Sequence, residues 1–426
     1  MRILLVQHHN FINGTGGTEK ICSFLASQFA KLGHDTHIAT NQVIEGEKAV
    51  FPLDKNVHVT NIYSKSTDQI HLLPYYNYPG KNPLMWLKFK LIKKFAKLKN
   101  ASIRKNRRFN NDREIYLYNL RQRSIGWKRY IDDLKPDIII TMSIGSLLEI
   151  SYQNSYNIPI INSTNGRPDY DFTDVVSYRN EIEKLSLINS FTKLDAIQVL
   201  FDSYHQFLPK QFQGISQTIA NPIVQIDDSQ IVNHVKEKKR YKIINLATLT
   251  TACKQQHLAI EVFAKIKDQY PDWNLEFWGV GKDYKVLKKL IEEHALCDRV
   301  FLKGFTEQPK QVLKQGDIFL FLSKYEGFPL ALGEAMSIGL PCIGFANCSG
   351  VNELIEDQET GFLAKNLIEV ESVLKCLISN PKMRHQIGKA AHDSMKNYQE
   401  QRVFKDWEKI IQRVVQKRKK SISVNL

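Results

Sequence analysis

Two glutamates in the second half of the chain, Glu326 and Glu334, are separated by seven residues, the first of which is a glycine. One carboxylate can accept hydrogen bonds from two neighbouring hydroxyl groups, so this pair suits a ligand rich in hydroxyls. Gly327 has no Cβ, and the backbone there can approach a ligand closely. The amides of Phe328 and Leu330 follow near the expected start of a helix, where an anion such as a diphosphate is favoured. Hydroxyl acceptors beside an anion site point to a nucleotide sugar.

The elements around these residues place them at one edge of a sheet. The apolar run 318–322 has the length of a strand, residues 332–338 favour a helix that Gly339 ends, and a second apolar run covers 341–345. A turn between a strand and a helix lies at the carboxyl end of a parallel sheet, where open α/β folds bind ligands. The simpler alternative is a pair of acids that stabilises a helix N-terminus on a solvated turn.

The composition limits the class of protein. A chain of 426 residues is too long for one ordinary core and suits two α/β domains of about 200 residues each. No apolar run approaches the roughly 20 residues that span a bilayer, and residues 1–9 resemble a buried strand more than a signal peptide. The six cysteines are scattered without a C-x-x-C pair, which indicates a reduced, cytoplasmic protein with free thiols and no metal site.

Two further turns between a strand and a helix carry residues that suit a phosphate. Gly16 and Gly17 belong to a glycine-rich turn after the first strand, which can direct amides toward phosphate or sugar, although a plain structural turn fits as well. The loop after the apolar run 243–247 holds Thr248 and Lys254. A lysine at such a turn supplies a compact charge for a diphosphate.

The stretch 325–343, Y-E-G-F-P-L-A-L-G-E-A-M-S-I-G-L-P-C-I, resembles the donor-site motif of retaining family 4 glycosyltransferases, and the match continues through 350–363. The segment G-G-T-E at 16–19 is similar to that family's G-G-x-E loop. The family has the GT-B architecture, in which two Rossmann-like, doubly wound domains face each other across a deep cleft. The resemblance implies that Glu334 holds the donor ribose and that Glu326 meets the transferred sugar near its reacting carbon.

The resemblance also implies the other residues of the donor site. Lys254 corresponds approximately to the lysine of the family's Arg-plus-Lys pair and is expected to be catalytic together with Glu326. The expected donor-binding residues are Gly16, Gly17, Thr248, Gly279, Gly304, Gly327, Phe328, Pro329, Leu330 and Glu334. The leaving phosphate is the expected base for the acceptor hydroxyl, so neither a metal nor a further cofactor is expected beside the nucleotide-sugar donor.

Two departures from the family pattern leave other functions open. Thr248 stands where the family has its arginine, and the strand ends at 142–145 and 162–168 lack the histidine that many members carry. Asn165 and Arg167 occupy the second of these ends and are the expected acceptor-side residues. A non-catalytic partner subunit of a glycosyltransferase complex is one alternative, and a UDP-sugar epimerase on the same scaffold is another. A nucleic-acid binder would explain the net charge of +15 but not the glutamate motif.

Residues 84–108 form a basic segment with a helical period. It contains no acid, and its basic residues are Lys88, Lys90, Lys93, Lys94, Lys97, Lys99, Arg104, Lys105, Arg107 and Arg108. Apolar residues recur at steps of three and four, at Leu84, Leu87, Leu91, Phe95 and Leu98. Such a helix fits a surface of anionic lipid headgroups, where each basic residue adds about 1 kcal/mol. The alternatives are a helix packed on the core with a solvated basic face, and a nucleic-acid helix, for which no known binding motif is present.

We therefore predict an α/β protein of GT-B fold, with an acceptor-binding domain over 1–220 that ends in a strand at 195–200. A donor-binding domain over 221–395 follows, and residues 396–426 form a helix that returns to the first domain and a basic tail. The predicted reaction moves a hexose from a nucleotide sugar, with UDP the favoured nucleotide, to a glycan or lipid-linked acceptor with retention at the anomeric carbon. The predicted location is the inner face of the plasma membrane, with no nucleic-acid partner.

Overall fold

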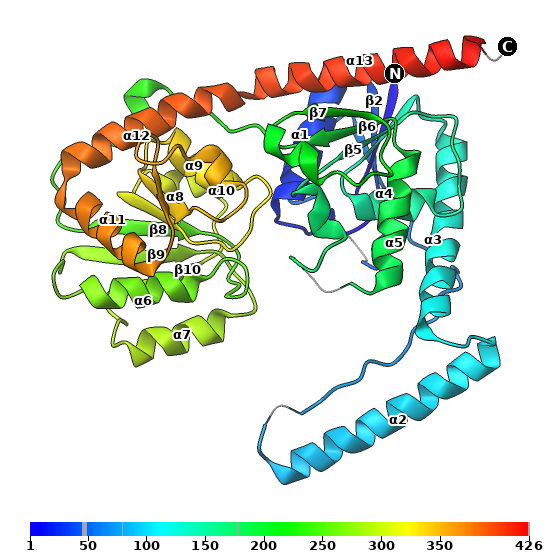
Figure 1. Cartoon of the computed structure of the whole chain (residues 1–426), viewed down its shortest axis with the longest axis horizontal. Helices are drawn as coiled ribbons and strands as arrows, with labels where there is room; N and C mark the ends of the chain where they lie inside the picture. The colour runs from blue at the N-terminus through cyan, green and yellow to red at the C-terminus, as the bar shows by residue number, and fades with distance from the viewer. Residues whose placement is uncertain (45–48, 79, 177–178, 425–426) are drawn as a thin grey trace.

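The computed structural model describes residues 1–44, 49–78, 80–176 and 179–424, which form two lobes, each with a parallel sheet and covering helices (Figure 1). The N-terminal lobe has a seven-stranded sheet in the order β3-β2-β1-β4-β5-β6-β7. Its strands are β1 (Arg2–Val6), β2 (Asp35–Thr40), β3 (Val57–Asn61), β4 (Ile138–Thr141), β5 (Ile160–Ser163), β6 (Ala196–Val199) and β7 (Ile215–Thr218). Its α-helices are α1 (Gly17–Lys31), α2 (Pro83–Arg107), α3 (Asp112–Leu134), α4 (Ile144–Ser151) and α5 (Glu181–Ser190).

The central strands of this sheet are apolar on both faces because helices cover both faces. All four residues of β4 are buried, and in β1 only Arg2 is exposed. The prediction that this domain ends with the strand at 195–200 is wrong, because β7 pairs with β6 beyond it. Three of the four residues of β7, I-S-Q-T, are polar, and the strand lies at the sheet edge, where a strand needs little apolar signal.

The C-terminal lobe has a six-stranded sheet in the order β10-β9-β8-β11-β12-β13. Its strands are β8 (Tyr241–Leu246), β9 (Trp273–Trp278), β10 (Val300–Gly304), β11 (Ile318–Phe321), β12 (Cys342–Phe345) and β13 (Phe362–Ala364). Its helices are α6 (Gln256–Ile266), α7 (Tyr284–Glu293), α8 (Pro309–Leu313), α9 (Leu330–Ser337), α10 (Val351–Leu354), α11 (Leu367–Ser379) and α12 (Pro381–Met395). The winding reverses between β8 and β11, so the switch point where such sheets bind ligands lies between these two strands.

The last helix, α13 (Glu400–Val424), runs from the C-terminal lobe along the N-terminal lobe (Figure 1). Its apolar side chains at steps of three and four, including Phe404, Trp407 and Ile411, are buried in one cluster with side chains of β1 and α1. The helix therefore ties the end of the chain to the sheet with which the chain begins.

Helix α2 projects away from the N-terminal lobe and forms, with the extended residues 68–78, a structure that we call the arm (Figure 1). Asn82 caps the helix and Pro83 is its first residue, both favoured at a helix start. The inner face of α2 contacts the extended segment: Asn100 exchanges two hydrogen bonds of 2.9 Å with the backbone of Leu73, and Lys93 donates to Asn77 at 2.7 Å.

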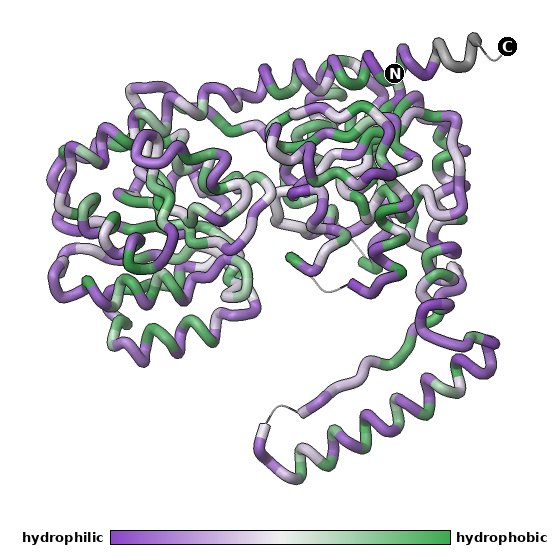
Figure 2. The backbone as a smooth tube through the Cα atoms, viewed as in Figure 1, coloured by the Kyte–Doolittle hydropathy of each residue, from purple (hydrophilic) through white to green (hydrophobic). Residues whose placement is uncertain are grey.

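The opposite face of α2 carries the apolar stripe and covers nothing. The stripe residues Leu84, Leu87, Leu91, Phe95 and Leu98 are between 50% and 77% exposed. Figure 2 shows hydrophobic positions recurring among hydrophilic ones along this helix. The predicted helix is confirmed, and the alternative of a helix packed on the core is wrong. Among the described residues, no helix is both long enough and apolar enough to cross a bilayer.

Candidate active site

The predicted catalytic residues meet at the switch point of the C-terminal sheet. Lys254 follows β8 and Glu326 follows its neighbour β11, and the Lys254 Nζ donates to the Glu326 Oε1 at 2.5 Å. The two side chains are only 22% and 10% exposed. Burial opposes the charge of Lys254, but the Glu326 carboxylate outweighs that effect and raises the pKa of Lys254 above its usual value. The lysine is therefore charged at neutral pH and suits a phosphate.

Glu334 is also paired with a lysine, and this lysine comes from the other lobe. The Lys20 Nζ, in the first turn of α1, donates to the Glu334 Oε1 on α9. Lys20 was not among the residues predicted from the sequence, although it directly follows the glycine-rich segment that had been assigned to the site. One signal could have identified Lys20: it is a basic residue in the first turn of a helix that begins at an expected phosphate-binding loop.

The N-termini of two helices approach each other beside these pairs. Helix α1 begins at Gly17 and α9 begins at Leu330, and a Cβ added to Gly17 would lie 3.3 Å from the Leu330 Cδ1. The first turns of helices leave amides without partners within the helix and carry partial positive charge. The predicted residues Gly16, Gly17 and Leu330 are thus brought together from both lobes at a place that favours an anion.

Gly327 has no room for a side chain. The group that lies close to it is the backbone of the N-terminal lobe, whereas the sequence had suggested a ligand. A Cβ at Gly327 would lie 2.2 Å from the backbone oxygen of Asn165 and 2.6 Å from the Cα of Gly166, both in the loop after β5. The Tyr204 hydroxyl donates to the Gly327 carbonyl at 3.0 Å. The glycine therefore lets the N-terminal lobe dock against the donor loop.

Phe328 and Pro329, which follow Gly327, have structural roles in this loop. The Phe328 ring is buried between the lobes, stacked on Phe201 with centroids 5.3 Å apart and edge-on to Tyr398 at 5.5 Å. Pro329 is the residue that precedes the first turn of α9. The side chain of Phe328 is thus part of the interlobe packing, and only its amide is left to meet a donor.

The remaining predicted donor residues lie at the ends of β8, β9 and β10. Gly279 has a φ of +143°, and a Cβ there would lie 2.1 Å from the Ala247 carbonyl oxygen. Its amide donates to the Gly304 carbonyl at 2.8 Å, and Gly304 itself has a φ of +78°. These glycines are required by the backbone. Thr248 is exposed, and its carbonyl accepts from the Gln256 Nε2 at 2.9 Å.

The two predicted acceptor-side residues are engaged within the N-terminal lobe. The Asn165 Nδ2 donates to the Met142 carbonyl at 2.7 Å. Arg167 donates twice to Asp169, at 2.7 and 2.9 Å, and its guanidinium lies 4.1 Å from the ring centroid of Phe207. Arg167 is therefore a paired, stacked arginine and not a free surface cation.

A histidine does stand at a strand end of this lobe, after β1, which is not one of the two strand ends where a histidine was expected. The His8 Nδ1 lies 2.9 Å from the Ser146 Oγ, and a Cβ added to Gly145 would lie 3.0 Å from the His8 Cε1. Burial, with a smaller effect of His9, lowers the pKa of His8 well below its usual value. The ring is therefore neutral at neutral pH and suits hydrogen bonding to a hydroxyl.

Thiol chemistry at the site is disfavoured. Cys253 and Cys348 lie near the Lys254–Glu326 pair, and burial raises the pKa of both thiols. Protonated thiols are poor nucleophiles. The two thiols are therefore not candidate nucleophiles, and the lysines and glutamates remain the candidate functional residues.

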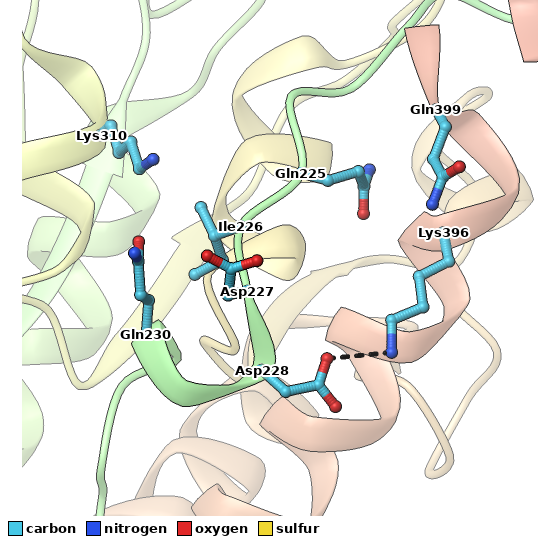
Figure 3. Close-up of a pocket in the computed structure, with 8 residues that line it drawn as sticks. All are labelled: Gln225, Ile226, Asp227, Asp228, Gln230, Lys310, Lys396 and Gln399. Atoms are coloured by element: carbon cyan, nitrogen blue, oxygen red, sulfur yellow. Dashed lines mark hydrogen bonds and ion pairs between the residues drawn. The ribbon is translucent and has the colours of Figure 1, made fainter. Parts of the chain in front are cut away.

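A pocket of about 440 Å³ lies elsewhere, where the linker 225–230 faces α8 and the end of α12 (Figure 3). Asp228, His392 and Asp393 have ligand atoms within 4.8 Å of one another beside it. Lys389 and Lys396 already bond to these two aspartates, at 2.7 to 3.2 Å. Two ammonium groups disfavour a divalent cation there, and none of the predicted donor residues lines this pocket.

Comparison with known proteins relates this chain to glycosyltransferases by sequence and by fold. Residues 227–394 match the family model described as Glycosyl transferases group 1. An uncharacterized glycosyltransferase of Haemophilus influenzae is 24% identical over 94% of this chain and 97% of its own length. A poly(ribitol-phosphate) alpha-N-acetylglucosaminyltransferase of Staphylococcus aureus is 24% identical over 70% of this chain and 58% of its own length.

Among solved structures, a mutant of S. aureus TarM, in a complex with fondaparinux, alpha-GlcNAc-glycerol and UDP, is similar with a TM-score of 0.69 and 15% identity. The match covers 96% of this chain and 99% of that chain. The fold is GT-B, as the sequence predicted. The sequence matches, taken with this fold, support a glycosyltransferase.

Proposed function

We propose that the chain is a retaining glycosyltransferase of family 4 that transfers a hexose from a UDP-sugar to a glycan or lipid-linked acceptor. The observation that carries the proposal is the Lys254–Glu326 pair at the switch point, with Glu334 one helix turn into α9. The UDP held by the similar TarM structure and the polymeric acceptor in the name of the S. aureus relative support the choice of substrates. In this proposal residues 221–395 bind the donor and residues 1–220 bind the acceptor.

The proposed reaction is the one that the resemblance to retaining glycosyltransferases implies, and the charges of the site are compatible with it. The bond between the sugar C1 and the β-phosphate oxygen breaks, and its electron pair leaves with the diphosphate. The acceptor hydroxyl oxygen bonds to C1 on the same face, and its proton passes to the leaving phosphate oxygen. Lys254 and the helix amides stabilise the charge that grows on the diphosphate, and Glu326 faces the sugar. No step in this scheme calls for a metal.

The test is release of free nucleotide from a panel of UDP-, GDP- and ADP-sugars, with and without a bacterial membrane extract as the source of acceptor. We expect release from one donor, increased by the extract, and a product whose anomeric configuration matches the donor. Inversion of configuration would contradict the retaining mechanism. Interconversion of the sugar without an acceptor would identify an epimerase. No release and no binding of any donor would favour a non-catalytic subunit, the reading that Thr248 leaves open.

We also propose that the arm holds the protein on an anionic membrane, at the inner face of the plasma membrane. The apolar stripe is flanked on the helical wheel by Lys88 and Lys99 on one side and by Lys90 and Lys94 on the other. Apolar side chains can enter the acyl region while these lysines contact phosphate headgroups. The absence of acids from 84–108 explains why lipid is preferred to a second protein of mixed charge.

Vesicle cosedimentation checks this proposal. The double variant Leu91→Glu, Phe95→Glu is expected to bind vesicles containing phosphatidylglycerol at least about tenfold more weakly than the native chain, because both side chains face outward. The control is Ile368→Glu on α11, which changes an apolar residue that is even more exposed, at 76%, on the other lobe and should bind normally. Equal binding to purely zwitterionic vesicles, or a dimer that the double variant dissociates without vesicles, would contradict the assignment.

A further inference from the structure

We infer that Lys20 is a second cation for the donor diphosphate, supplied by the N-terminal lobe where Thr248 replaces the expected arginine. The inference rests on the proposed function. Lys20 has no partner of opposite charge on its own lobe within the described residues; its ammonium crosses to Glu334 on the C-terminal lobe. It stands one turn after Gly17, which meets the first residue of α9.

Contacts within the N-terminal lobe hold the backbone at the start of α1, from which the Lys20 side chain extends. The buried carboxylate of Glu19 accepts from the Gln7 Nε2 at 2.7 Å, and a Cβ at Gly16 would lie 2.5 Å from the Glu19 Oε2. The Lys20 amide donates to the Gly16 carbonyl at 3.3 Å. Glu19 therefore fastens the glycine loop to β1 from inside, and Lys20, next to it, points outward to the other lobe. The backbone that carries Lys20 is therefore held within its own lobe, and only the side chain has to exchange Glu334 for a ligand.

The charges of the site show how this lysine would be used. Each glutamate of the motif is neutralised by one lysine, Glu326 by Lys254 and Glu334 by Lys20. The ribose and hexose hydroxyls carry no charge. When these hydroxyls bond to the two carboxylates in place of the lysines, both ammonium groups lose their present partners. Two ammonium groups then face a donor diphosphate that carries two negative charges. The donor thus exchanges two internal ion pairs for two ion pairs with itself.

The two lysines belong to different lobes of the protein. Lys254 belongs to the lobe that carries Glu326 and Glu334, whereas Lys20 reaches the diphosphate only when the lobes are together. Stabilisation of the leaving group by Lys20 therefore depends on lobe closure. In this arrangement, Lys20 assists cleavage of the bond between the sugar and the diphosphate only while the acceptor-binding lobe is in place.

The test compares nucleotide and nucleoside binding by calorimetry, using the purified full chain. For Lys20→Ala we expect UDP to bind about 10- to 100-fold more weakly, the loss for one charge-assisted hydrogen bond. Uridine, which lacks phosphates, should bind unchanged or more tightly because Glu334 is free for the ribose. Glu334→Gln should weaken UDP and uridine alike. Lys31→Ala, at the other end of α1, is the matched control and should bind both as the native chain does.

The outcomes separate the inference from the proposed function. If the native chain binds UDP and Lys20→Ala binds it equally well, Lys20 is not a diphosphate ligand. If Lys20→Ala weakens UDP and uridine by the same factor, the lysine only holds the lobes together, and the inference is wrong. If the native chain binds none of UDP, GDP and ADP, the proposed function itself fails. Partial recovery of UDP binding in Lys20→Arg and in Lys20→Ala, Thr248→Arg would support the exchange of one cation for another.

Discussion

Replacement of Lys254 by alanine is expected to lower sugar transfer by about 10³-fold, the usual loss when one preorganised donor to a developing negative charge is removed. Lys254 follows β8 at the switch point, and its ammonium is the nearest fixed positive charge to Glu326, at 2.5 Å. The charge on the diphosphate grows as the bond to the sugar breaks, so part of the loss should fall on kcat, and the part due to the charges that the bound donor already carries should appear as weaker donor binding. The measurement is nucleotide release at saturating and limiting donor.

The same substitution should also destabilise the protein, which the experiment must separate from catalysis. Without Lys254 the Glu326 carboxylate, only 10% exposed, has lost its ion-pair partner, at a cost of about 1–3 kcal/mol in unfolding free energy. Glu326→Gln in the Lys254→Met background removes both charges and should restore most of that stability without restoring activity. Recovery of activity along with stability would show that the pair is structural.

A surface ion pair supplies the matched control. Lys289 and Glu293 on α7 form a lysine–glutamate contact of 3.1 Å, but their side chains are 76% and 54% exposed. Lys289→Ala is expected to change neither activity nor stability measurably, because water screens such pairs. A comparable loss of transfer in Lys289→Ala would mean that general charge, and not the position of Lys254, controls the reaction.

Much of the fold and the centre of the site could be predicted because both depend on short-range patterns. The apolar run before Glu326 forms β11, and the helix after it begins at Leu330, as the order of strand, turn and helix requires. The helical period of 84–108 likewise appears as α2. The edge strand β7 was missed because three of its four residues are polar, and no apolar run marked it.

The contacts between lobes could not be predicted, because they join residues far apart in the sequence. Lys20 and Glu334 are 314 positions apart, and nothing in the motif around either residue indicates that the two are in contact. His8 was missed for a related reason, since it stands at the end of β1 while the resemblance directed attention to the ends of β4 and β5. Such pairings become visible only when the two lobes are placed relative to each other.

Gly327→Val is the second substitution with a large expected effect, a fall of about 10²-fold or more in transfer. The Cβ would lie 2.2 Å from the Asn165 backbone oxygen, far inside van der Waals contact, and backbone cannot swing aside as a flexible side chain can. The loop after β11 or the loop after β5 must therefore move. Either movement displaces Glu326 or separates the lobes, and a shift of about 1 Å at a reacting centre is enough for that loss.

The control distinguishes this effect from a general intolerance of glycine substitution. Gly126, inside α3, has nothing within 4 Å of an added Cβ, so Gly126→Ala should leave transfer unchanged and stabilise the protein by about 0.5–1 kcal/mol. If the clash acts by holding the lobes apart, Gly327→Val should also lose the dependence of UDP binding on Lys20, since that ammonium would no longer reach the donor. Normal transfer by Gly327→Val would mean that the docked arrangement of the lobes is not the one in which the reaction occurs.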